Sequence, residues 1–363
     1  MSDIVVLSVV PYTLTATSGT TVRARLVLDI ILKRYNVLLL SWRNLSGNDS
    51  NNNRSCYDGR VLHKELNGSA LLRTLKVIPF VLQNSFRIVY CVHDPLSFLP
   101  FAVFSRIKGF RTIYEAHALI YKERLQVSLA QAILYLLLEF LVAKSANCII
   151  ALSGRTFNFF KRFNKNTVYI PVFVDSFKFV PKSGFGSSER KTIGLIGPFD
   201  NPLNSYQIEF VYKNLDLFDR RIQFRIIGAC KNRISHERVT YSGYITNEFE
   251  YISELKNLDG LIVPVRIATY GPKTKILEAM MCGVPVFTTP QGIVGLDFVR
   301  PGQDLIVCNE TELVSVVNST IFNDNASLKL RENARRFAEK YFSQQRFERK
   351  LLDVISKELH VRD

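Results

Sequence analysis

The chain has few cysteines, and none is placed as a metal site or a disulfide framework would require. There is no CxxC pair, and no histidine stands near a cysteine at the spacing of a zinc ligand. These absences argue against structural zinc and against a small domain stapled by disulfides. We therefore expect reduced cysteines that serve as packing residues in a cytosolic protein: Cys56, Cys91, Cys148, Cys230, Cys282 and Cys308.

Long apolar runs are also lacking. The most apolar helix candidate covers residues 129–143 and contains Gln131 and Glu139. A membrane span needs about 20 residues, so we expect this helix to be buried or interfacial. Residues 1–12 run straight into an apolar strand without a basic start or a small-residue cleavage site. The sequence therefore predicts no signal peptide.

Acidic residues are sparse in the first half of the chain. Residues 1–181 hold 22 Lys/Arg and 10 Asp/Glu, which is +12 of the total net charge of +15. Such a basic region favours an anionic partner: nucleic acid, an anionic membrane surface or a phosphorylated substrate. The sequence shows no aromatic–basic RNA motif and no zinc finger, so no nucleic acid is expected. The alternative is that the charge reflects only the general composition of the organism's proteins.

The 363 residues suggest two domains, since domains average roughly 150 residues. Short β-branched runs alternate with helical periodicity, and this pattern restarts after a Gly/Ser-rich linker at residues 183–188. Such alternation is typical of parallel sheets covered by helices. We expect an N-terminal α/β domain at 1–181, a second at 182–340, and a C-terminal helix at 341–363 that packs back toward the first. The expected strands are 4–10, 35–40, 87–92, 111–115, 148–151, 192–196, 224–228, 260–265 and 285–289.

The segment 260–296 carries the most chemical information, because its helix near residues 274–282 breaks two rules. Lys273 and Lys275 stand at the helix start, where the helix dipole prefers acids. An anion held by the lysines and the backbone N–H groups would remove this mismatch. Glu278 is the one charged residue among apolar neighbours, and burying it is costly unless it is hydrogen-bonded. The hydroxyls of a ribose would supply two donors. The alternatives are a solvated lysine pair and a glutamate that reaches solvent or pairs with a lysine.

The run Tyr270-Gly-Pro-Lys-Thr-Lys-Ile-Leu-Glu-Ala-Met-Met-Cys-Gly-Val-Pro-Val resembles the donor-site signature of retaining glycosyltransferases of family GT4. These have the GT-B fold, which implies two Rossmann-like domains with parallel sheets facing a central cleft. The trailing Gln291-Gly-Ile-Val-Gly-Leu is similar too. Weaker similarity runs over most of the chain: Ser18-Gly-Thr-Thr-Val-Arg23 resembles the family's N-terminal Gly-containing loop, Tyr114-Glu-Ala-His117 its histidine-bearing strand end, and Pro171-Val-Phe-Val-Asp175 its domain-crossing segment.

The resemblance implies a role for each matching residue. Glu278 would bind the ribose, and Gly19, beside Ser18, would let the backbone approach the phosphate. His117 would hydrogen-bond the transferred sugar, the alternative being a structural core histidine. The residues lining the diphosphate and sugar would be Gly271, Lys273, Thr274 and Lys275. Of all these, we expect His117, Lys273 and Lys275 to carry catalysis.

The sequence departs from the family pattern at two places. Tyr270 stands where the family often has a first glutamate, so the donor-sugar contacts must differ. The segment 197–204 lacks the Arg and Lys that often follow the first strand of the second domain. The diphosphate charge must then be met by Lys273, Lys275, Arg266 and helix N-termini.

The resemblance implies transfer, with retention, from a nucleotide-diphosphate sugar to a glycan or lipid-linked acceptor. No Asp-x-Asp stands at a strand end, so we expect neither a metal nor another cofactor. No nucleophile stands out, although Glu115 or His117 could be considered, and attack on the same face as the leaving phosphate fits better. The alternatives are a nucleotide-sugar epimerase of the same fold and a catalytically impaired GT-B partner subunit.

The residues 97–110 mix bulky apolar side chains with Arg106 and Lys108. Such a stretch can lie on an anionic membrane, and the protein would then be cytoplasmic and peripheral on the membrane face. The alternative is an ordinary core helix with solvated basic ends.

Overall fold

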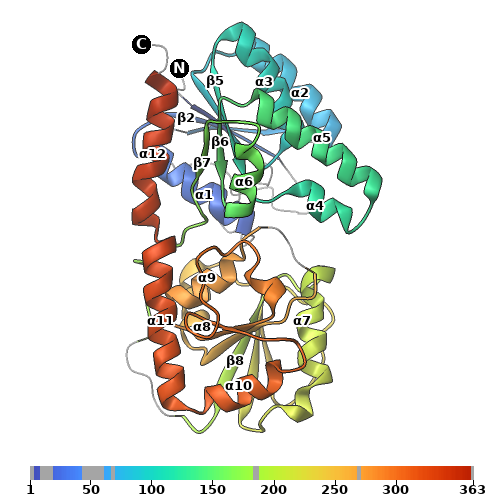
Figure 1. Ribbon diagram of the computed structural model, residues 1–363, viewed down its shortest axis with the longest axis vertical. Helices are drawn as coiled ribbons and strands as arrows, with labels where there is room; N and C mark the ends of the chain where they lie inside the picture. The colour runs from blue at the N-terminus through green and yellow to red at the C-terminus, as the bar shows by residue number, and fades with distance from the viewer. Residues whose placement is uncertain are drawn as a thin grey trace. The chain divides into compact units, whose positions relative to one another are not determined.

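The computed structural model describes residues 4–8, 19–42, 61–66, 70–182, 188–267 and 271–360. The chain forms two compact units (Figure 1): unit 1 is Met1–Val172 with Phe347–Asp363, and unit 2 is Phe173–Arg346. The boundaries thus differ from the expected 181 and 340. Residues 173–174 belong with unit 2 because Val174 N donates to Phe342 O over 2.7 Å, and Gln344 N donates to Val174 O over 3.0 Å.

Unit 1 contains a seven-stranded parallel sheet in the order β3-β2-β1-β4-β5-β6-β7. Its central strands are continuous apolar runs, and all five residues of β4 are buried, as expected for a parallel sheet covered on both faces. The strands are β1 (Ile4–Ser8), β2 (Val37–Trp42), β3 (Val61–Leu66), β4 (Ile88–Val92), β5 (Arg111–Ala116), β6 (Cys148–Ala151) and β7 (Thr167–Tyr169).

Helices connect these strands and cover the sheet of unit 1. A core of buried aromatic and aliphatic side chains from α2, α3, α5 and α6 packs on the strands and includes the fully buried Phe98, Phe101 and Phe160. The described helices are α1 (Gly19–Leu32), α2 (Ala70–Gln83), α3 (Pro95–Lys108), α4 (Ile120–Leu125), α5 (Leu129–Ser145) and α6 (Gly154–Lys161).

Helix α3 corresponds to the stretch that we considered as a membrane contact. Phe98 and Phe101 point into the core and are fully buried. The Lys108 ammonium donates to the carbonyl oxygens of Val81 and Leu82 at 2.8 Å each, at the end of α2. One side of α3 therefore packs in the core, whereas Val103, Arg106, Ile107 and Lys108 on its other side are exposed. The membrane contact of this stretch stays a prediction.

Unit 2 repeats the same plan with a six-stranded parallel sheet in the order β10-β9-β8-β11-β12-β13. Its core includes Phe224, Ile262 and Phe287, which lie on one face of the sheet by their strand register. The strands are β8 (Lys191–Ile196), β9 (Ile222–Ile227), β10 (Val239–Gly243), β11 (Gly260–Val263), β12 (Val286–Thr288) and β13 (Ile306–Val307). The described α-helices are α7 (Pro202–Lys213), α8 (Glu248–Lys256), α9 (Thr274–Met281), α10 (Leu313–Ile321) and α11 (Asp324–Phe342).

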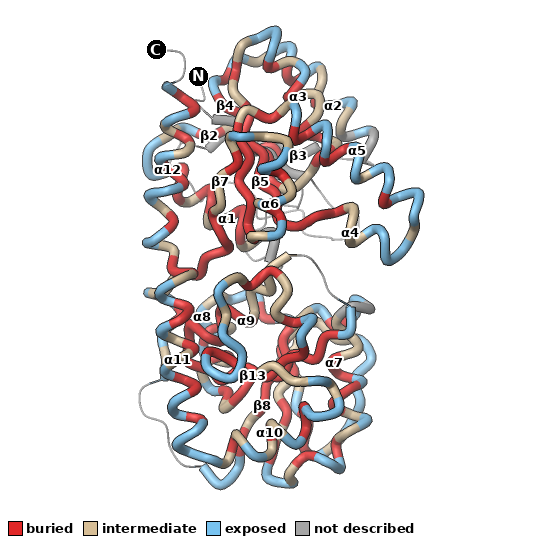
Figure 2. The backbone as a smooth tube through the Cα atoms, viewed as in Figure 1, coloured by how far each residue is buried: buried red, intermediate tan, exposed pale blue. Residues whose placement is uncertain are grey.

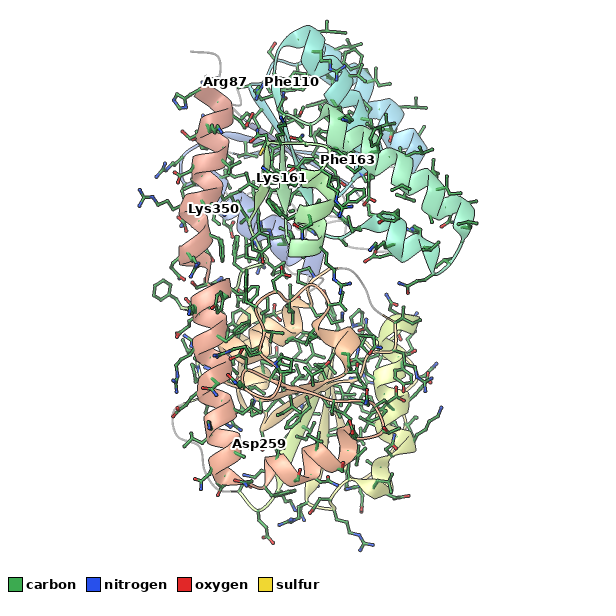
Figure 3. The ribbon with its side chains drawn as sticks, viewed as in Figure 1. Arg87, Phe110, Lys161, Phe163, Asp259 and Lys350 are labelled. Atoms are coloured by element: carbon green, nitrogen blue, oxygen red, sulfur yellow. The ribbon has the colours of Figure 1, made fainter. Side chains whose placement is uncertain are left out.

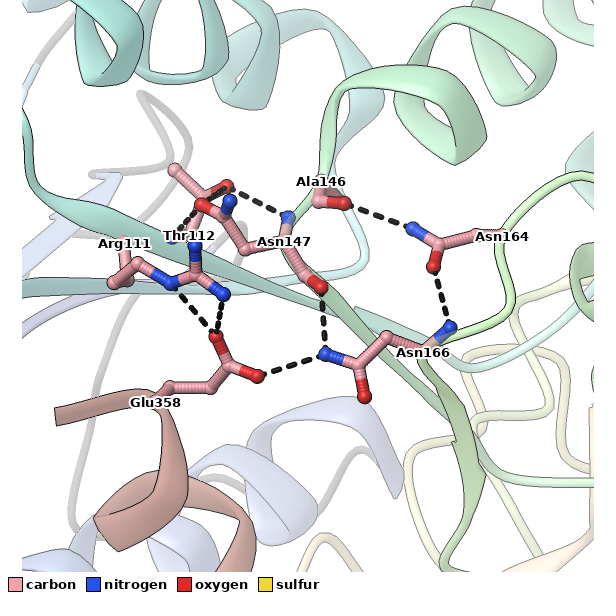
Figure 4. Close-up of polar contacts among 7 residues, drawn as sticks. All are labelled: Arg111, Thr112, Ala146, Asn147, Asn164, Asn166 and Glu358. Atoms are coloured by element: carbon pink, nitrogen blue, oxygen red, sulfur yellow. Dashed lines mark hydrogen bonds and ion pairs between the residues drawn. The ribbon is translucent and has the colours of Figure 1, made fainter. Parts of the chain in front are cut away.

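The last helix, α12 (Gln344–His360), packs on the strands of unit 1. Its Glu358 receives two hydrogen bonds from Arg111 at the start of β5 and one from Asn166 before β7 (Figure 4). Lys350, labelled in Figure 3, donates to the carbonyl oxygen of Tyr169 over 2.7 Å. The C-terminal helix therefore completes unit 1 although it follows unit 2 in the sequence.

The cysteines are free wherever the structure describes them. Cys91, Cys148 and Cys282 are buried packing residues, whereas Cys230 and Cys308 are only partly buried. Cys56 lies outside the described residues.

Candidate functional site

Both sheets reverse their strand order at one point, between β1 and β4 in unit 1 and between β8 and β11 in unit 2. In open parallel sheets, ligands bind outside the carboxyl ends of the strands at such a switch point. Residues that follow β8, β11, β1 and β4 are therefore the first candidates for a site in each unit.

Lys275 lies at the switch point of unit 2. Its ammonium donates to the carbonyl oxygen of Ile196, the last residue of β8, over 2.7 Å. It also lies 3.1 Å from Gln207 Oε1 and 3.4 Å from Asn204 Oδ1, both on α7. These three acceptors are neutral, so burial and the nearby charge of Lys273 lower the Lys275 pKa to about 7. An anion arriving here would pair with the ammonium and favour its charged form.

Backbone glycines allow the close packing around Lys275. Gly197 follows β8 and Gly228 follows β9, and a Cβ added to Gly228 would lie 2.0 Å from the carbonyl oxygen of Gly197. Gly228 also has a φ of +132°, which side-chain-bearing residues rarely adopt. The ends of β8 and β9 therefore approach each other more closely than any other residue type would permit.

Helix α9 places the remaining predicted residues beside this point. It begins at Thr274, and the side chain of the preceding Lys273 makes no capping hydrogen bond to the helix. The Lys273 ammonium lies 3.4 Å from the carbonyl oxygen of Gln291. A helix N-terminus preceded by one lysine and containing another favours phosphate electrostatically.

Glu278 points from the middle of α9 and is buried. The Tyr251 hydroxyl on α8 donates to Glu278 Oε2 over 2.6 Å. Burial and the Glu278 charge raise the Tyr251 pKa well above its usual value, so the phenol stays a donor. The carboxylate is thus hydrogen-bonded inside the protein, which the sequence pattern had required of it.

The loop before α9 packs against the loop after β12. Gly295 has a φ of +89°, and a Cβ there would lie 2.8 Å from the backbone nitrogen of Pro272 and 2.9 Å from the carbonyl carbon of Gly271. The two motif segments that the sequence singled out, 271–282 and 291–296, are therefore in contact through backbone atoms. Gly295 is what permits this contact.

Arg266 follows β11 and pairs with Glu310 over 3.3 Å, with its guanidinium 4.2 Å from the ring centroid of Tyr206. The Glu310 carboxylate also accepts a hydrogen bond from the Tyr206 hydroxyl. Arg266 therefore already has a carboxylate partner. Tyr270 and Ser18 lie outside the described residues, and Gly19 is the first residue of α1.

Unit 1 gathers a buried polar cluster around Glu115 on β5. Arg23 of α1 donates to both carboxylate oxygens, Nε to Oε1 over 3.1 Å and Nη2 to Oε2 over 2.9 Å. The Tyr90 hydroxyl donates to Oε2, and His117 Nε2 lies 2.7 Å from Oε1. Burial raises the Glu115 pKa, but the Arg23 charge and the His117 hydrogen bond outweigh it, so the pKa lies well below its usual range.

This cluster rules Glu115 out as an exposed nucleophile, because its side chain is 0% exposed and four donor groups surround the carboxylate. Glu115 instead orients the His117 imidazole, whose side chain remains slightly exposed. His117 is therefore anchored in the core by Glu115, and its contact with a sugar stays a prediction.

His93 is a member of this cluster that the sequence analysis did not select. It follows β4, as His117 follows β5, and the two rings stack with centroids 4.9 Å apart. His93 Nδ1 accepts a hydrogen bond from His117 N over 3.2 Å, and His93 has a left-handed φ of 51°. Burial and the neighbouring His117 lower the His93 pKa to about 3, so its ring is neutral. The sequence could have indicated His93, because His93 and His117 each follow a predicted strand, 87–92 and 111–115.

Other contributors missed by sequence reasoning were Gln207, Asn204 and Tyr251, which come from helices without a recognisable motif. Among the described residues, no group of three or more His, Cys, Asp or Glu could hold a metal ion.

Comparison with known proteins adds a family and a fold. Residues 190–321 match the family of glycosyl transferases group 1. The matched segment contains β8, α9 and the contacts of Lys275 and Glu278. A search of curated protein sequences found no match.

Solved structures resemble the whole chain. HepE of Anabaena in complex with UDP is 15% identical, with a TM-score of 0.73, and the alignment covers 98% of this chain and 100% of HepE. Its complex with UDP-glucose is 14% identical with a TM-score of 0.74 and the same coverage. Sucrose-phosphate synthase of Thermosynechococcus elongatus is 18% identical with a TM-score of 0.78, covering 98% of each chain. These similarities show that the chain has the GT-B fold, with two α/β units built on parallel sheets.

Proposed function

We propose that the protein is a glycosyltransferase that transfers a sugar from a nucleotide-diphosphate donor. The observation that carries the proposal is the position of Lys275 and α9. They lie at the switch point of unit 2, within the segment that matches glycosyl transferases group 1. The complexes of HepE with UDP and UDP-glucose support a donor whose nucleotide is UDP.

In this proposal the protein's main task is to stabilise the leaving diphosphate. Lys275, Lys273 and the N-terminus of α9 would meet the negative charge that develops as the sugar departs, and such preorganised groups contribute strongly to catalysis. Gly271 and Thr274 would contact the diphosphate through the loop and the first turn of α9. No step of this scheme requires a metal ion or another cofactor.

Glu278 is proposed to accept hydrogen bonds from the ribose hydroxyls, with Tyr251 holding one carboxylate oxygen in place. In unit 1, His117 is proposed to hydrogen-bond the transferred sugar, held by Glu115 and backed by the neutral ring of His93. We propose retention of the anomeric configuration, as in GT4, a glycan or lipid-linked acceptor, and a cytoplasmic location.

The first test is thermal stabilisation by UDP-, GDP-, ADP- and dTDP-sugars. A ligand that binds only the folded protein adds about 2.7 kcal/mol at 100 times its Kd, and we expect the UDP-sugar to raise the Tm. Glu278→Gln and Lys275→Met should reduce that shift, whereas Lys231→Met, an exposed lysine of unit 2, should leave it unchanged. If no nucleotide sugar shifts the Tm of folded wild type, the proposal of a donor site is wrong.

Activity then separates the alternatives. Incubation with the UDP-sugar alone should release little free nucleotide, and adding extracts of glycan or lipid acceptors should increase release. An epimerase would instead change the sugar without releasing nucleotide. Binding of the donor with no transfer to any acceptor would favour the impaired partner subunit.

A further inference from the structure

Helix α5 exposes an apolar face that the fold of unit 1 leaves uncovered. At 3.6 residues per turn its exposed large side chains fall on one side of the helix, and Figure 2 shows much of this helix as exposed. The buried positions Ala132, Leu138, Val142 and Ala143 fall on the opposite side. The exposed apolar side chains are Leu129, Ile133, Leu134, Leu136, Leu137, Phe140 and Leu141.

The connection between α4 and α5 extends this face. Leu125 and Val127 are also exposed, and Val127 retains 74% of its accessible surface. Large contiguous apolar patches are rare on soluble monomers and mark sites of interaction with a protein or a membrane. We name this surface, residues 125–141 on their exposed side, the α4–α5 face.

The α4–α5 face is firmly held by the protein. Glu139 on the buried side of α5 accepts a hydrogen bond from Ile120 N over 2.7 Å and lies 3.5 Å from Tyr121 N, which fixes the start of α4. The Ser128 side chain accepts a hydrogen bond from Gln131 N and caps the start of α5. The exposed leucines therefore belong to a docked helix with capped ends.

Basic side chains border the α4–α5 face. The Lys144 ammonium lies 5.7 Å from the ring of the exposed Phe140. Arg124 lies 5.4 Å from the ring of Tyr135, on the opposite side of the helix, and so does not belong to this border. Phe163, labelled in Figure 3, packs on Phe140 with centroids 5.3 Å apart. The residues next to Phe163 in the sequence include the exposed Lys161, Arg162 and Lys165.

The charge of this region has one predominant sign. Residues 121–166 contain seven Lys/Arg and two Asp/Glu, and one of those two acids is the buried Glu139. Long basic side chains beside an apolar face can lay their stems on it and extend their charges to phosphate headgroups. Each such charge near an anionic bilayer contributes attraction over a Debye length.

We propose that the α4–α5 face binds the surface of a membrane containing anionic lipids. Its apolar side chains would enter the headgroup and acyl boundary, as in interfacial helices, and the basic border would contact lipid phosphates. Among the described residues, no helix is long and apolar enough to cross a membrane. α5 has 17 residues, or roughly 25 Å at 1.5 Å per residue, so it would lie along the surface.

A second copy of this chain fits the α4–α5 face less well. In a two-fold dimer the same patch meets itself, which would bring the basic borders of two copies together. Like charges would then repel around the apolar contact. An anionic bilayer offers acyl chains to the apolar face and phosphates to its basic border. This inference concerns membrane attachment and does not depend on the transfer reaction proposed above.

The test is flotation of the full chain with vesicles of phosphatidylcholine alone or with 30% phosphatidylglycerol added, in the absence of any nucleotide sugar. The variant Leu134→Gln/Leu137→Gln removes two side chains that are 53% and 57% exposed. The control Leu217→Gln/Leu328→Gln removes two leucines of unit 2 that are 66% and 47% exposed. Thermal unfolding should show that all three proteins are folded.

We expect wild type and the control to float with the phosphatidylglycerol vesicles, with at least a fivefold smaller bound fraction on phosphatidylcholine alone. The Leu134→Gln/Leu137→Gln variant should lose at least fivefold in bound fraction. The proposal is overturned if wild type binds neither vesicle, or if the variant binds like the control. It is also overturned if wild type is a lipid-independent dimer in sedimentation and the variant is a monomer. Because no donor is present, failure here leaves the donor site untouched.

Discussion

The Tyr251 hydroxyl donates a 2.6 Å hydrogen bond to Glu278 Oε2, joining α8 to α9 beneath the proposed nucleotide site. This hydrogen bond offsets part of the cost of burying the Glu278 carboxylate in an apolar helix. In the proposed function, Tyr251 would hold Glu278 Oε2 in place while the carboxylate binds the ribose.

We therefore predict that Tyr251→Phe weakens nucleotide binding by roughly tenfold and lowers the free energy of unfolding by about 1–3 kcal/mol. That range is the usual cost of depriving a buried polar group of its partner. Calorimetric titration with UDP and urea denaturation measure the two effects. Tyr212→Phe is the matched control, because its hydroxyl bonds Ile234 O and Tyr241 elsewhere in unit 2. Equal UDP affinity in Tyr251→Phe and wild type would contradict the role given to Tyr251.

A second prediction follows from the Lys275 pKa of about 7. Above pH 7 the ammonium is largely neutral in the free protein, and a bound diphosphate favours its charged form. Nucleotide binding at pH 8.5 should therefore take up close to one proton, and the Kd should rise toward tenfold per pH unit above pH 7.

Titration calorimetry with UDP at pH 8.5, in HEPES and in Tris, measures this uptake, because the two buffers release protons with different enthalpies. The observed binding enthalpy of wild type should differ between them. Lys275→Arg is the control, since arginine keeps its charge throughout this range and should show no buffer dependence. Identical enthalpies for wild type in both buffers would exclude a proton-coupled Lys275.

Most of the fold follows from the sequence because buried parallel strands are continuous apolar runs. The strands β4, β5 and β8 lie within one residue of their predicted bounds. Four strands at the sheet edges were missed: β3, β7, β10 and β13. β3 and β10 have polar residues in their runs, VLHKEL and VTYSG, and β7 and β13 have only three and two residues. The restart of the pattern in the second half predicted the second sheet for the same physical reason.

The candidate site was predictable only where its residues are consecutive. The α9 segment could be singled out from the sequence because it has two lysines at the helix start, Lys273 and Lys275, and one glutamate, Glu278, among apolar residues. Both features are unusual in a helix that binds no ligand. The partners Gln207 and Tyr251 come from separate helices with unremarkable sequences, and only packing brings them to α9. A local pattern carries no information on which distant side chain will satisfy a buried charge.

The buried pair of Arg23 and Glu115 gives a third prediction. Removing one partner of a buried ion pair typically costs 3–5 kcal/mol, because it leaves the other charge uncompensated. Arg23→Met should therefore lower the free energy of unfolding by about 3–5 kcal/mol. The double variant Arg23→Met/Glu115→Gln should recover part of that loss, since no buried charge remains.

Urea denaturation of wild type, both single variants and the double variant provides the thermodynamic cycle. The control is Arg336→Met, because Arg336 forms an exposed i,i+4 pair with Glu332. The neighbouring Arg335 is unsuitable, since it also donates to the carbonyl oxygen of Met281. Arg336→Met should change stability by less than about 1 kcal/mol. A double variant as unstable as the sum of the two single variants would show that the pair is not coupled.

The fourth prediction concerns Glu139, which fixes α4 to α5 under the proposed membrane face. Burial raises its pKa to about 8, more than the hydrogen bonds from Ile120 N and Tyr121 N lower it, and the charge of Glu123 adds to the rise. In the unfolded chain the pKa is near the ordinary glutamate value of about 4.3. Between these values the folded protein holds a proton that the unfolded chain has lost.

Since the unfolded state binds fewer protons in this window, the free energy of unfolding must fall as pH rises from about 4.3 to about 8. The stability that the protonated Glu139 carboxyl contributes is fully present below the unfolded-state pKa of about 4.3. It is lost as the pH rises through the folded-state pKa of about 8. Glu139→Gln keeps an oxygen to accept from Ile120 N and does not titrate. Wild type should therefore lose a few kcal/mol relative to Glu139→Gln across this range.

Urea denaturation of both proteins at intervals from pH 4.5 to pH 8.5 measures the difference, in which the other titrating groups cancel. Glu332→Gln, an exposed acid on α11, is the control and should track wild type at every pH. A constant difference between Glu139→Gln and wild type would show that Glu139 is already ionised in the folded protein. A loss of stability in wild type relative to Glu139→Gln that grows from pH 4.5 to about pH 8 would instead place a proton on this buried carboxyl in the folded protein.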